Sequence, residues 1–317
     1  MRSVDDLVAR AREGDQRSVG RLISLVENAA PELRDVMAAL APHSGSARLI
    51  GLTGSPGVGK STTTSALLTA YRGRGERVGV LAIDPTSPFS GGALLGDRVR
   101  MQDHATDPGV YIRSMGTRGH LGGVSWATPQ AIRVLDAVGC DVVIIETVGV
   151  GQAEVEIASL ADSTVVMLAP GLGDGIQAAK AGILEIADLY VVNKADRDGA
   201  THTVRDLKAM LTLGEKPKPG DWQPPVLSTV SLRSEGVTEL VEALDKHREW
   251  LSTTDELTVR RKRRAAEEIE ALAVTALRER IGDLRGGTLL AELADEVLAG
   301  TTDPYAAADR LVSAVEG

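Results

Sequence analysis

The sequence predicts an α/β fold with a mostly parallel, doubly wound sheet flanked by helices. Strands that alternate with helices form parallel βαβ units. Five apolar runs have the length of strands and lack polar alternation, as strands buried on both faces do; they lie at 48–52, 77–83, 141–145, 164–169 and 188–192. Helical patterns separate these runs, at about 61–73, 128–138, 152–160 and 175–186.

The residues before the first run predict a helical N-terminal segment, 1–46. Apolar residues recur at helical spacing between 3 and 41, and Pro31 breaks the pattern. A short linker at 42–46 then leads into the α/β domain.

The residues after the fifth run complete the α/β domain and predict a helical C-terminal arm. A Pro/Gly-rich loop at 214–225 precedes a last strand near 226–230 and a helix at about 235–251. The α/β domain is therefore expected at 47–251. Charged, helical patterns then fill 252–317, with a break at Asp303-Pro304.

Composition bounds the function classes. The 317 residues are 43% hydrophobic and 25% charged, as in ordinary globular proteins. A net charge of −9 argues against a general nucleic-acid binder, and the single cysteine, Cys140, excludes a disulfide framework within the chain. No apolar stretch approaches the roughly 18–20 residues of a membrane span, and the acidic start is unlike a secretory signal. We expect a cytoplasmic protein.

A phosphate-binding loop follows the first strand. The segment 54–61 matches the full G-x-x-x-x-G-K-[ST] pattern between a strand and a helix. Its glycines allow successive N–H groups to turn inward, where the positive end of the next helix adds to phosphate binding. A chance glycine-rich turn is the alternative, but pattern and context both favour a P-loop NTPase. The predicted nucleotide-binding residues here are Gly54, Ser55, Pro56, Gly57, Val58, Gly59, Lys60, Ser61 and Thr62.

An acidic residue at the end of the strand 141–145 predicts the magnesium site. Glu146-Thr-Val-Gly149 stands where common GTPases have Asp-x-x-Gly. We expect Lys60 to reach the β and γ phosphates, Ser61 and Glu146 to hold Mg²⁺, and the Gly149 N–H to sense the γ phosphate. A capping acid at a strand end is the other interpretation of Glu146.

The strand 188–192 leads directly into Asn193-Lys194-Ala195-Asp196. In the Asn-Lys-x-Asp motif the aspartate accepts hydrogen bonds from the ring N–H and exocyclic amine of guanine, a donor pair that adenine lacks. We therefore predict binding of GTP and GDP. Ser228, Thr229 and Val230, at the end of the last strand, are expected to add a backbone contact to the guanine oxygen, although ordinary loop is the alternative.

Several long segments together resemble one family. The chain is similar to the methylmalonyl-CoA mutase-associated GTPases of the MeaB/ArgK/MMAA type, which belong to the P-loop GTPases that serve metal and cobalamin enzymes. The resemblance rests on 51–62, 82–101, 145–154, 193–196 and the terminal 303–308. It implies a GTPase and cytoplasmic homodimer with the C-terminal helices as its dimer arm. It also implies a chaperone that gates cofactor loading and protection of adenosylcobalamin-dependent methylmalonyl-CoA mutase.

The resemblance also implies switch segments. The loop between Asp84 and Asp97 resembles switch I, and either aspartate could bind Mg²⁺, directly or through water, or help position the attacking water. A helix-capping acid is the other interpretation of Asp97. Asp174 and Lys180 would report the nucleotide state to the mutase, although a flexible loop is an equal alternative. Val150, which follows Gly149, stands where Ras-like GTPases have the glutamine that aligns water, so intrinsic hydrolysis should be slow.

Two other function classes compete with this interpretation. A kinase or transport-linked ATPase would need adenine binding, which Asn193 to Asp196 oppose. A metallochaperone-type GTPase would need metal ligands, but the five histidines are scattered and Cys140 stands alone. We expect neither nucleic acid nor a membrane as a partner.

Overall fold

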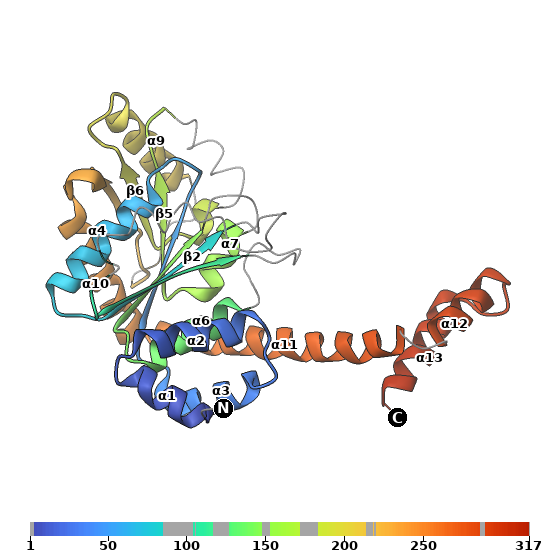
Figure 1. Cartoon of the computed structure of the whole chain (residues 1–317). Coiled ribbons are helices and arrows are strands. Elements are labelled where there is room, and N and C mark those ends of the chain that lie inside the picture. The colour runs from blue at the N-terminus through green and yellow to red at the C-terminus, as the bar shows by residue number, and fades with distance from the viewer. Residues whose placement is uncertain are drawn as a thin grey trace. The chain divides into compact units, whose positions relative to one another are not determined.

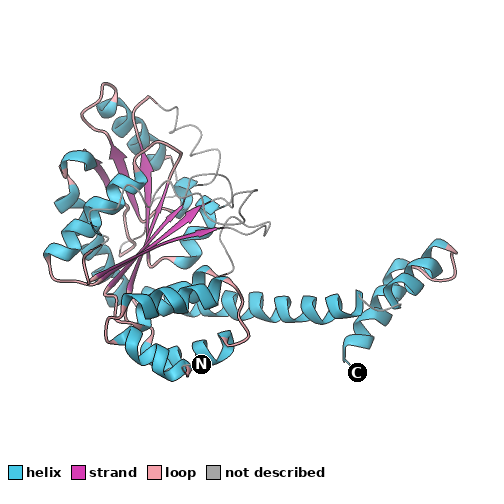
Figure 2. Ribbon diagram, viewed as in Figure 1, coloured by secondary structure: helices cyan, strands magenta, loops and turns pink. Residues whose placement is uncertain are grey.

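Seven parallel strands form one sheet in the described part of the chain (Figure 2). The computed structural model describes residues 3–84, 104, 106–116, 127–147, 153–171, 183–213, 218, 220–285 and 289–316. The strand order is β3-β2-β4-β1-β5-β6-β7. The strands are β1 (Arg48–Thr53), β2 (Val78–Asp84), β3 (Val110–Gly116), β4 (Val142–Thr147), β5 (Ser163–Leu168), β6 (Leu189–Asn193) and β7 (Val226–Thr229). This sheet confirms the predicted α/β fold.

Side chains alternate between the two faces of the sheet, and both faces are buried. Ile50 and Ile144 pack on one face with helices α4 (Lys60–Gly73) and α10 (Val237–Thr253), which lie side by side (Figure 1). Leu49 and Ile145 pack on the other face. That burial on both sides explains why the strands read as continuous apolar runs.

The N-terminal helices extend the core on the face opposite α4. They are α1 (Val4–Arg12), α2 (Gln16–Glu27) and α3 (Leu33–Leu40), and their buried residues join those of α6 (Thr128–Ala137) and α7 (Ala153–Leu160). Asp15 caps α2 by accepting a hydrogen bond from the N–H of Arg17 at 3.1 Å, as a residue at that position commonly does. The N-terminal segment is thus packed against the α/β core.

One strand and one α-helix of the described residues were not among the sequence predictions. Strand β3 carries Arg113 and Ser114 in its middle, so it lacks the apolar run of its neighbours; Arg113 instead forms an ion pair with Glu27 of α2. Helix α9 (Ala200–Thr212) packs against β5 and β6, where its Leu207 is buried in one cluster with Val166 and Val192. Of the helix predicted at 175–186, only Ile183–Ile186 lies in the described residues, as a 3-10 turn.

The chain divides into two compact units, Met1–Arg260 and Arg261–Gly317. Helix α11 (Glu256–Arg285) begins in the first unit, and the second contains α12 (Leu289–Leu298) and α13 (Pro304–Glu316). Asp303 accepts the N–H of Tyr305 at 2.8 Å, so the Asp-Pro pair starts α13, as its sequence indicates. No helix among the described residues is long and apolar enough to cross a membrane.

Candidate nucleotide site

The phosphate-binding loop joins the carboxyl end of β1 to the first residue of α4. Gly54 has φ +139° and Gly59 has φ +100°, conformations that favour glycine. A Cβ atom at Gly54 would lie 2.2 Å from the Met167 carbonyl oxygen, and one at Gly59 would lie 2.3 Å from Asn193 Nδ2. Glycine is required at both positions because backbone and side chain from β5 and β6 approach so closely.

The Lys60 side chain folds back over this loop. Its Nζ donates to the carbonyl oxygens of Gly54 at 2.5 Å and Ser55 at 3.2 Å, and the residue is 7% exposed. The loop therefore holds one ammonium charge at the amino end of α4, where the helix dipole also favours an anion. This arrangement suits the phosphates of a nucleotide.

Glu146 lies beside the loop because β4 is the neighbour of β1, with Glu146 in register with Leu52. The carboxylate is buried and accepts a hydrogen bond on each oxygen. Ser61 Oγ donates to Oε1 at 2.6 Å and Thr64 Oγ1 donates to Oε2 at 2.8 Å. The structure thus brings Ser61 and Glu146 together and adds Thr64, which the sequence analysis had not singled out.

A magnesium ion fits the chemistry of this donor set. The Ser61 hydroxyl and the Glu146 carboxylate offer hard oxygen ligands next to the phosphate-binding loop. Mg²⁺ usually takes one or two carboxylates together with substrate phosphates and waters, so a larger carboxylate cage is not needed. Nickel or zinc would favour softer nitrogen or sulfur ligands.

Several predicted residues of the switches lie outside the described residues: Asp97, Gly149, Asp174 and Lys180. Asp84 ends β2, where its backbone is in register with Gly116 of β3. Its side chain is outside what the structure describes. The roles of Asp84, Asp97, Gly149, Asp174 and Lys180 therefore stay predictions.

Asn193 connects the base motif to the phosphate-binding loop. Its Nδ2 donates to the Val58 carbonyl oxygen at 2.9 Å. Its Oδ1 accepts three hydrogen bonds, from Thr229 Oγ1 at 3.1 Å, Ser231 N at 3.1 Å and Ser231 Oγ at 3.0 Å. Lys194 Nζ also donates to the Gly57 carbonyl oxygen. One buried carboxamide therefore fixes the spacing between two loops that follow different strands.

The carboxylate of Asp196 is partly open to solvent, with 39% of its side chain exposed. Arg233 Nη1 lies 3.4 Å from Asp196 Oδ2, while Arg233 Nε donates to Glu235 Oε1 at 2.7 Å. Of the three residues predicted at the end of the last strand, Ser228 is exposed, Thr229 is buried as the last residue of β7, and Val230, just after β7, is also buried. The loop facing the Asn-Lys-x-Asp segment thus also includes Ser231 and Arg233. Sequence reasoning missed both, and only their position just after the last strand could have drawn attention to them.

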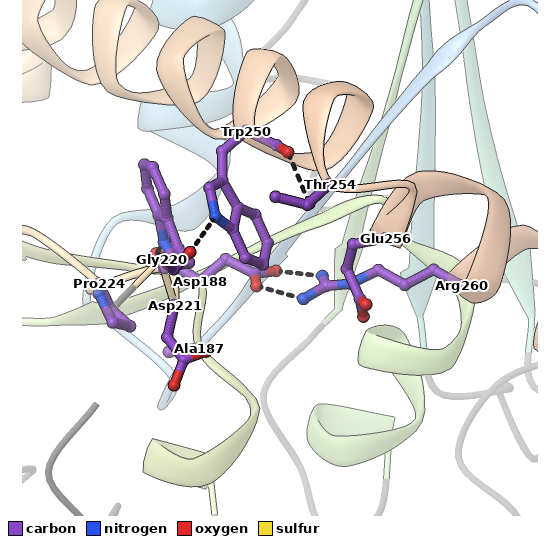
Figure 3. Close-up of a pocket in the computed structure, with 10 residues that line it drawn as sticks. Ala187, Asp188, Gly220, Asp221, Pro224, Trp250, Thr254, Glu256 and Arg260 are labelled. Carbon is purple, nitrogen blue, oxygen red and sulfur yellow. Dashed lines mark hydrogen bonds and ion pairs between the residues drawn. The ribbon is translucent and has the colours of Figure 1, made fainter. Parts of the chain in front are cut away.

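A separate cavity of about 500 Å³ is lined by residues that include Asp188, Trp250 and Arg260 (Figure 3). Because Asp188 directly precedes β6, this cavity lies at the amino end of that strand, whereas the nucleotide loops follow the carboxyl ends of the strands. Asp188, which precedes β6, accepts Arg260 Nη1 and Nη2 on its two oxygens, each at 2.9 Å. Burial alone would raise the pKa of Asp188, but the neighbouring His247 and the hydrogen bonds from Arg260 outweigh it and lower that pKa below its ordinary value. This ion pair connects the amino-terminal part of α11 to the sheet.

Comparison with known proteins agrees with the motifs. The family model described as "Methylmalonyl Co-A mutase-associated GTPase MeaB" matches residues 19–284. A putative GTPase of Pyrococcus abyssi is 46% identical over 99% of this chain and 97% of its own. GTPase ArgK of Escherichia coli is 35% identical, over 82% of this chain and 80% of its own.

Two further proteins extend this comparison. The "methylmalonic aciduria type A homolog, mitochondrial" of Caenorhabditis elegans is 38% identical over 67% of this chain, which matches 54% of that relative. A solved structure described as "LAO/AO transport system kinase" superposes with a TM-score of 0.72 at 25% identity, over 99% of this chain and 98% of its own. The family match and the P-loop and Asn-Lys-x-Asp motifs agree: this chain belongs to the MeaB family of methylmalonyl-CoA mutase-associated GTPases.

Proposed function

We propose that this protein is a magnesium-dependent GTP-hydrolysing switch that acts as a chaperone for adenosylcobalamin-dependent methylmalonyl-CoA mutase. The observation that carries the proposal is the position of Asn193, which bonds Val58 in the phosphate-binding loop and Ser231 beside the base motif. Phosphate and base recognition are thereby held at one fixed separation, as a guanine nucleotide requires.

Each part of the site has a defined task in this proposal. The loop amides and Lys60 bind the β and γ phosphates, and Asp196 accepts hydrogen bonds from guanine. Ser61 and Glu146 would hold Mg²⁺, with Asp84 or Asp97 as further candidates. When bound, that ion would offset negative charge on the phosphate oxygens. Gly149, Asp97, Asp174 and Lys180 are assigned to the switches on the strength of the family resemblance.

The partner is proposed from the family's description and from the printed name of the C. elegans relative. A switch protein without the usual water-aligning glutamine needs another group to complete its site, which a bound partner can supply. We therefore propose that the mutase sets the state of the switches, and that the protein gates cofactor loading and protection in the cytoplasm.

The decisive experiment is GTP turnover with and without the mutase. We expect slow hydrolysis alone, faster hydrolysis with the mutase, and none with Lys60→Ala in either case. Unchanged turnover over a full titration with the mutase and cobalamin would remove the chaperone role while leaving a GTPase.

Nucleotide competition tests the base preference separately. Labelled GDP should be displaced by GTP but not by ATP at equal concentration. Displacement by ATP as effective as that by GTP would contradict guanine selectivity and favour an ATPase or kinase.

A further inference from the structure

Thr64 holds the one oxygen of Glu146 that the P-loop pattern leaves unaccounted for. The pattern assigns Ser61 to the metal site, and Ser61 Oγ donates to Glu146 Oε1 at 2.6 Å. Thr64 lies one helical turn later on α4, and its Oγ1 donates to Oε2 at 2.8 Å. One face of α4 therefore supplies a donor to each oxygen of this carboxylate.

Thr64 and Glu146 are both buried, so the hydrogen bond between them is shielded from solvent. Thr64 is 0% exposed and Glu146 is 2% exposed. Glu146 lies near the end of β4, in register with Leu52 of β1 and Ala82 of β2, so its backbone is fixed on both sides. The orientation of its carboxylate then depends on the contacts of the side chain, which include the bonds from Ser61 and Thr64.

The hydrogen bond from Thr64 matters because the residue at this position is a glutamate. It has one more rotatable bond than the aspartate common in GTPases, and its terminal torsion is broad rather than confined to narrow wells. A single hydrogen bond to one oxygen leaves rotation of the carboxylate plane about that bond. A second bond to the other oxygen removes that rotation.

We propose that Thr64 is a positioning residue for the magnesium site: it fixes the plane of the Glu146 carboxylate so that Oε1 faces Ser61. This inference rests on the proposed magnesium-dependent GTPase function and deepens it. Groups that orient metal ligands typically change metal affinity by 10–100-fold when removed. A residue that only fills space would change folding stability without changing the response to metal.

The test compares Thr64→Val with Thr64→Ser and with Thr69→Val. Valine keeps the shape and removes the hydroxyl, and serine keeps the hydroxyl. Thr69 lies on the same helix, but its Oγ1 bonds the Ser65 carbonyl oxygen at 2.9 Å and lies 3.3 Å from His104 Nε2, so its contacts differ from those of Thr64. The measurement is the Mg²⁺ concentration that half-maximally slows release of fluorescent GDP. The melting temperature without metal or nucleotide is recorded for every variant.

We expect Thr64→Val to raise that Mg²⁺ concentration roughly tenfold, the low end for a ligand-orienting group. For Thr64→Ser and Thr69→Val, the half-maximal Mg²⁺ concentration should stay within about twofold of that of the parent protein. Such a change is smaller than the effect of losing a group that orients a metal ligand. A lower melting temperature for Thr64→Val with an unchanged Mg²⁺ response would overturn the proposal. So would an equal shift in Thr64→Ser, because that variant retains the donor.

A double-mutant cycle with Glu146→Asp separates a direct role from an indirect one. Aspartate is one methylene shorter and cannot span the same two hydroxyls from the same backbone position. In the E146D background, Thr64→Val should therefore add less than about twofold, as expected when two residues act as a unit. A full tenfold addition in that background would show that Thr64 acts independently of Glu146 and contradict the proposal.

The same experiment separates failure of this inference from failure of the proposed function. If the parent protein binds GDP with no response to Mg²⁺, both are wrong. If the parent responds to Mg²⁺ and Thr64→Val responds identically, only the role of Thr64 is wrong.

Discussion

Asp196 and Asn193 belong to the same short motif but have different roles. Asn193 is buried and makes four hydrogen bonds within the protein, so its task is to connect loops. Asp196 is partly exposed, so its carboxylate can accept hydrogen bonds from a ligand. Substitutions at the two positions should separate assembly of the site from recognition of the base.

Asp196→Asn should lower GDP affinity and leave folding stability unchanged. The amide presents a donor where guanine also donates, and hydrogen bonds to a charged group contribute about 1.5–3 kcal/mol, or roughly 10–150-fold in affinity. Titration with fluorescent GDP measures the loss, and xanthosine diphosphate should bind the variant better than the parent.

The matched control for that variant is Asp198→Asn. Asp198 is an exposed aspartate two residues away. It should behave like the parent protein. Retained guanine selectivity in Asp196→Asn would remove Asp196 from its assigned role.

Cys140 should not react in the native protein. It is 2% exposed, and burial raises the pKa of its thiol to about 12. Thiolate is the reactive form, so both access and ionisation are suppressed at neutral pH. A disulfide reagent should label Cys140 only after denaturant is added, and stoichiometric labelling of the folded protein would contradict this burial.

At the scale of elements, the Asp188–Arg260 ion pair joins α11 to β5 and β6. Asp188 Oδ2 also accepts the Thr164 N–H at 2.8 Å, and Arg260 Nη1 also donates to the Asp162 carbonyl oxygen at 3.0 Å. His247, fully buried, lies 3.3 Å from Asp188 Oδ1 through its Nε2 and bonds Ser163 Oγ through its Nδ1. The loss of one partner leaves a buried carboxylate less well compensated.

Arg260→Ala should destabilise the first unit by about 3 kcal/mol, the lower end for a broken buried pair because the Thr164 N–H and His247 remain. The pH dependence should change as well. The folded pKa of Asp188 lies below its ordinary value of 3.8, so its stabilisation is present above that pH and is lost as pH falls through the folded pKa. Without Arg260 that pKa rises, and the loss should begin at higher pH.

Denaturant unfolding at several pH values from 3 to 7 measures both effects. Arg263→Ala is the matched control, because its partner contact is an exposed pair with Glu267 at 3.7 Å on the same helix. Identical unfolding curves for Arg260→Ala and Arg263→Ala would show that the buried pair contributes nothing measurable.

Elements with one strong local signal could be predicted from the sequence, and those defined by distant partners could not. The strands β1, β4, β5 and β6 read as apolar runs because both of their faces are buried. In the described sheet, strand β3 has a neighbour on one side only, and its Arg113 forms an ion pair with Glu27, 86 positions earlier in the chain. No local pattern contains that pairing.

The site shows the same division. The P-loop and the Asn-Lys-x-Asp segment are contiguous motifs whose residue types follow from phosphate and guanine chemistry. Thr64 and Ser231 enter the site through bonds to Glu146 and Asn193, 82 and 38 positions away in sequence. Those contacts depend on the order of strands in the sheet, which the sequence does not specify locally.

At the scale of the whole molecule, the second unit exposes large apolar side chains, whose contact with water is unfavourable in an isolated chain. Ile269 is 67% exposed, Leu277 52% and Leu272 47%, all on α11. Exposed apolar surface on a helix commonly marks an interface with another protein. Together with the family resemblance, this exposure leads us to propose that the C-terminal helices form a homodimer arm.

Replacing Ile269 and Leu272 with glutamate should therefore convert a dimer into a monomer. Burying two charged side chains in an apolar interface without partners is strongly unfavourable. The measurement is mass by light scattering across a concentration series. The first unit contains the nucleotide loops and does not include these residues, so GDP affinity of the variant should match that of the parent.

Glu267→Lys combined with Glu270→Lys is the matched control, because it changes two charges on the same helix without touching the apolar residues. That control should retain the mass of the parent. A parent protein that is monomeric at every concentration would overturn the homodimer. A dimer that survives both glutamates would place the interface elsewhere on the chain and leave the exposed apolar residues of α11 available to a different partner, for which the mutase is the first candidate to test by binding.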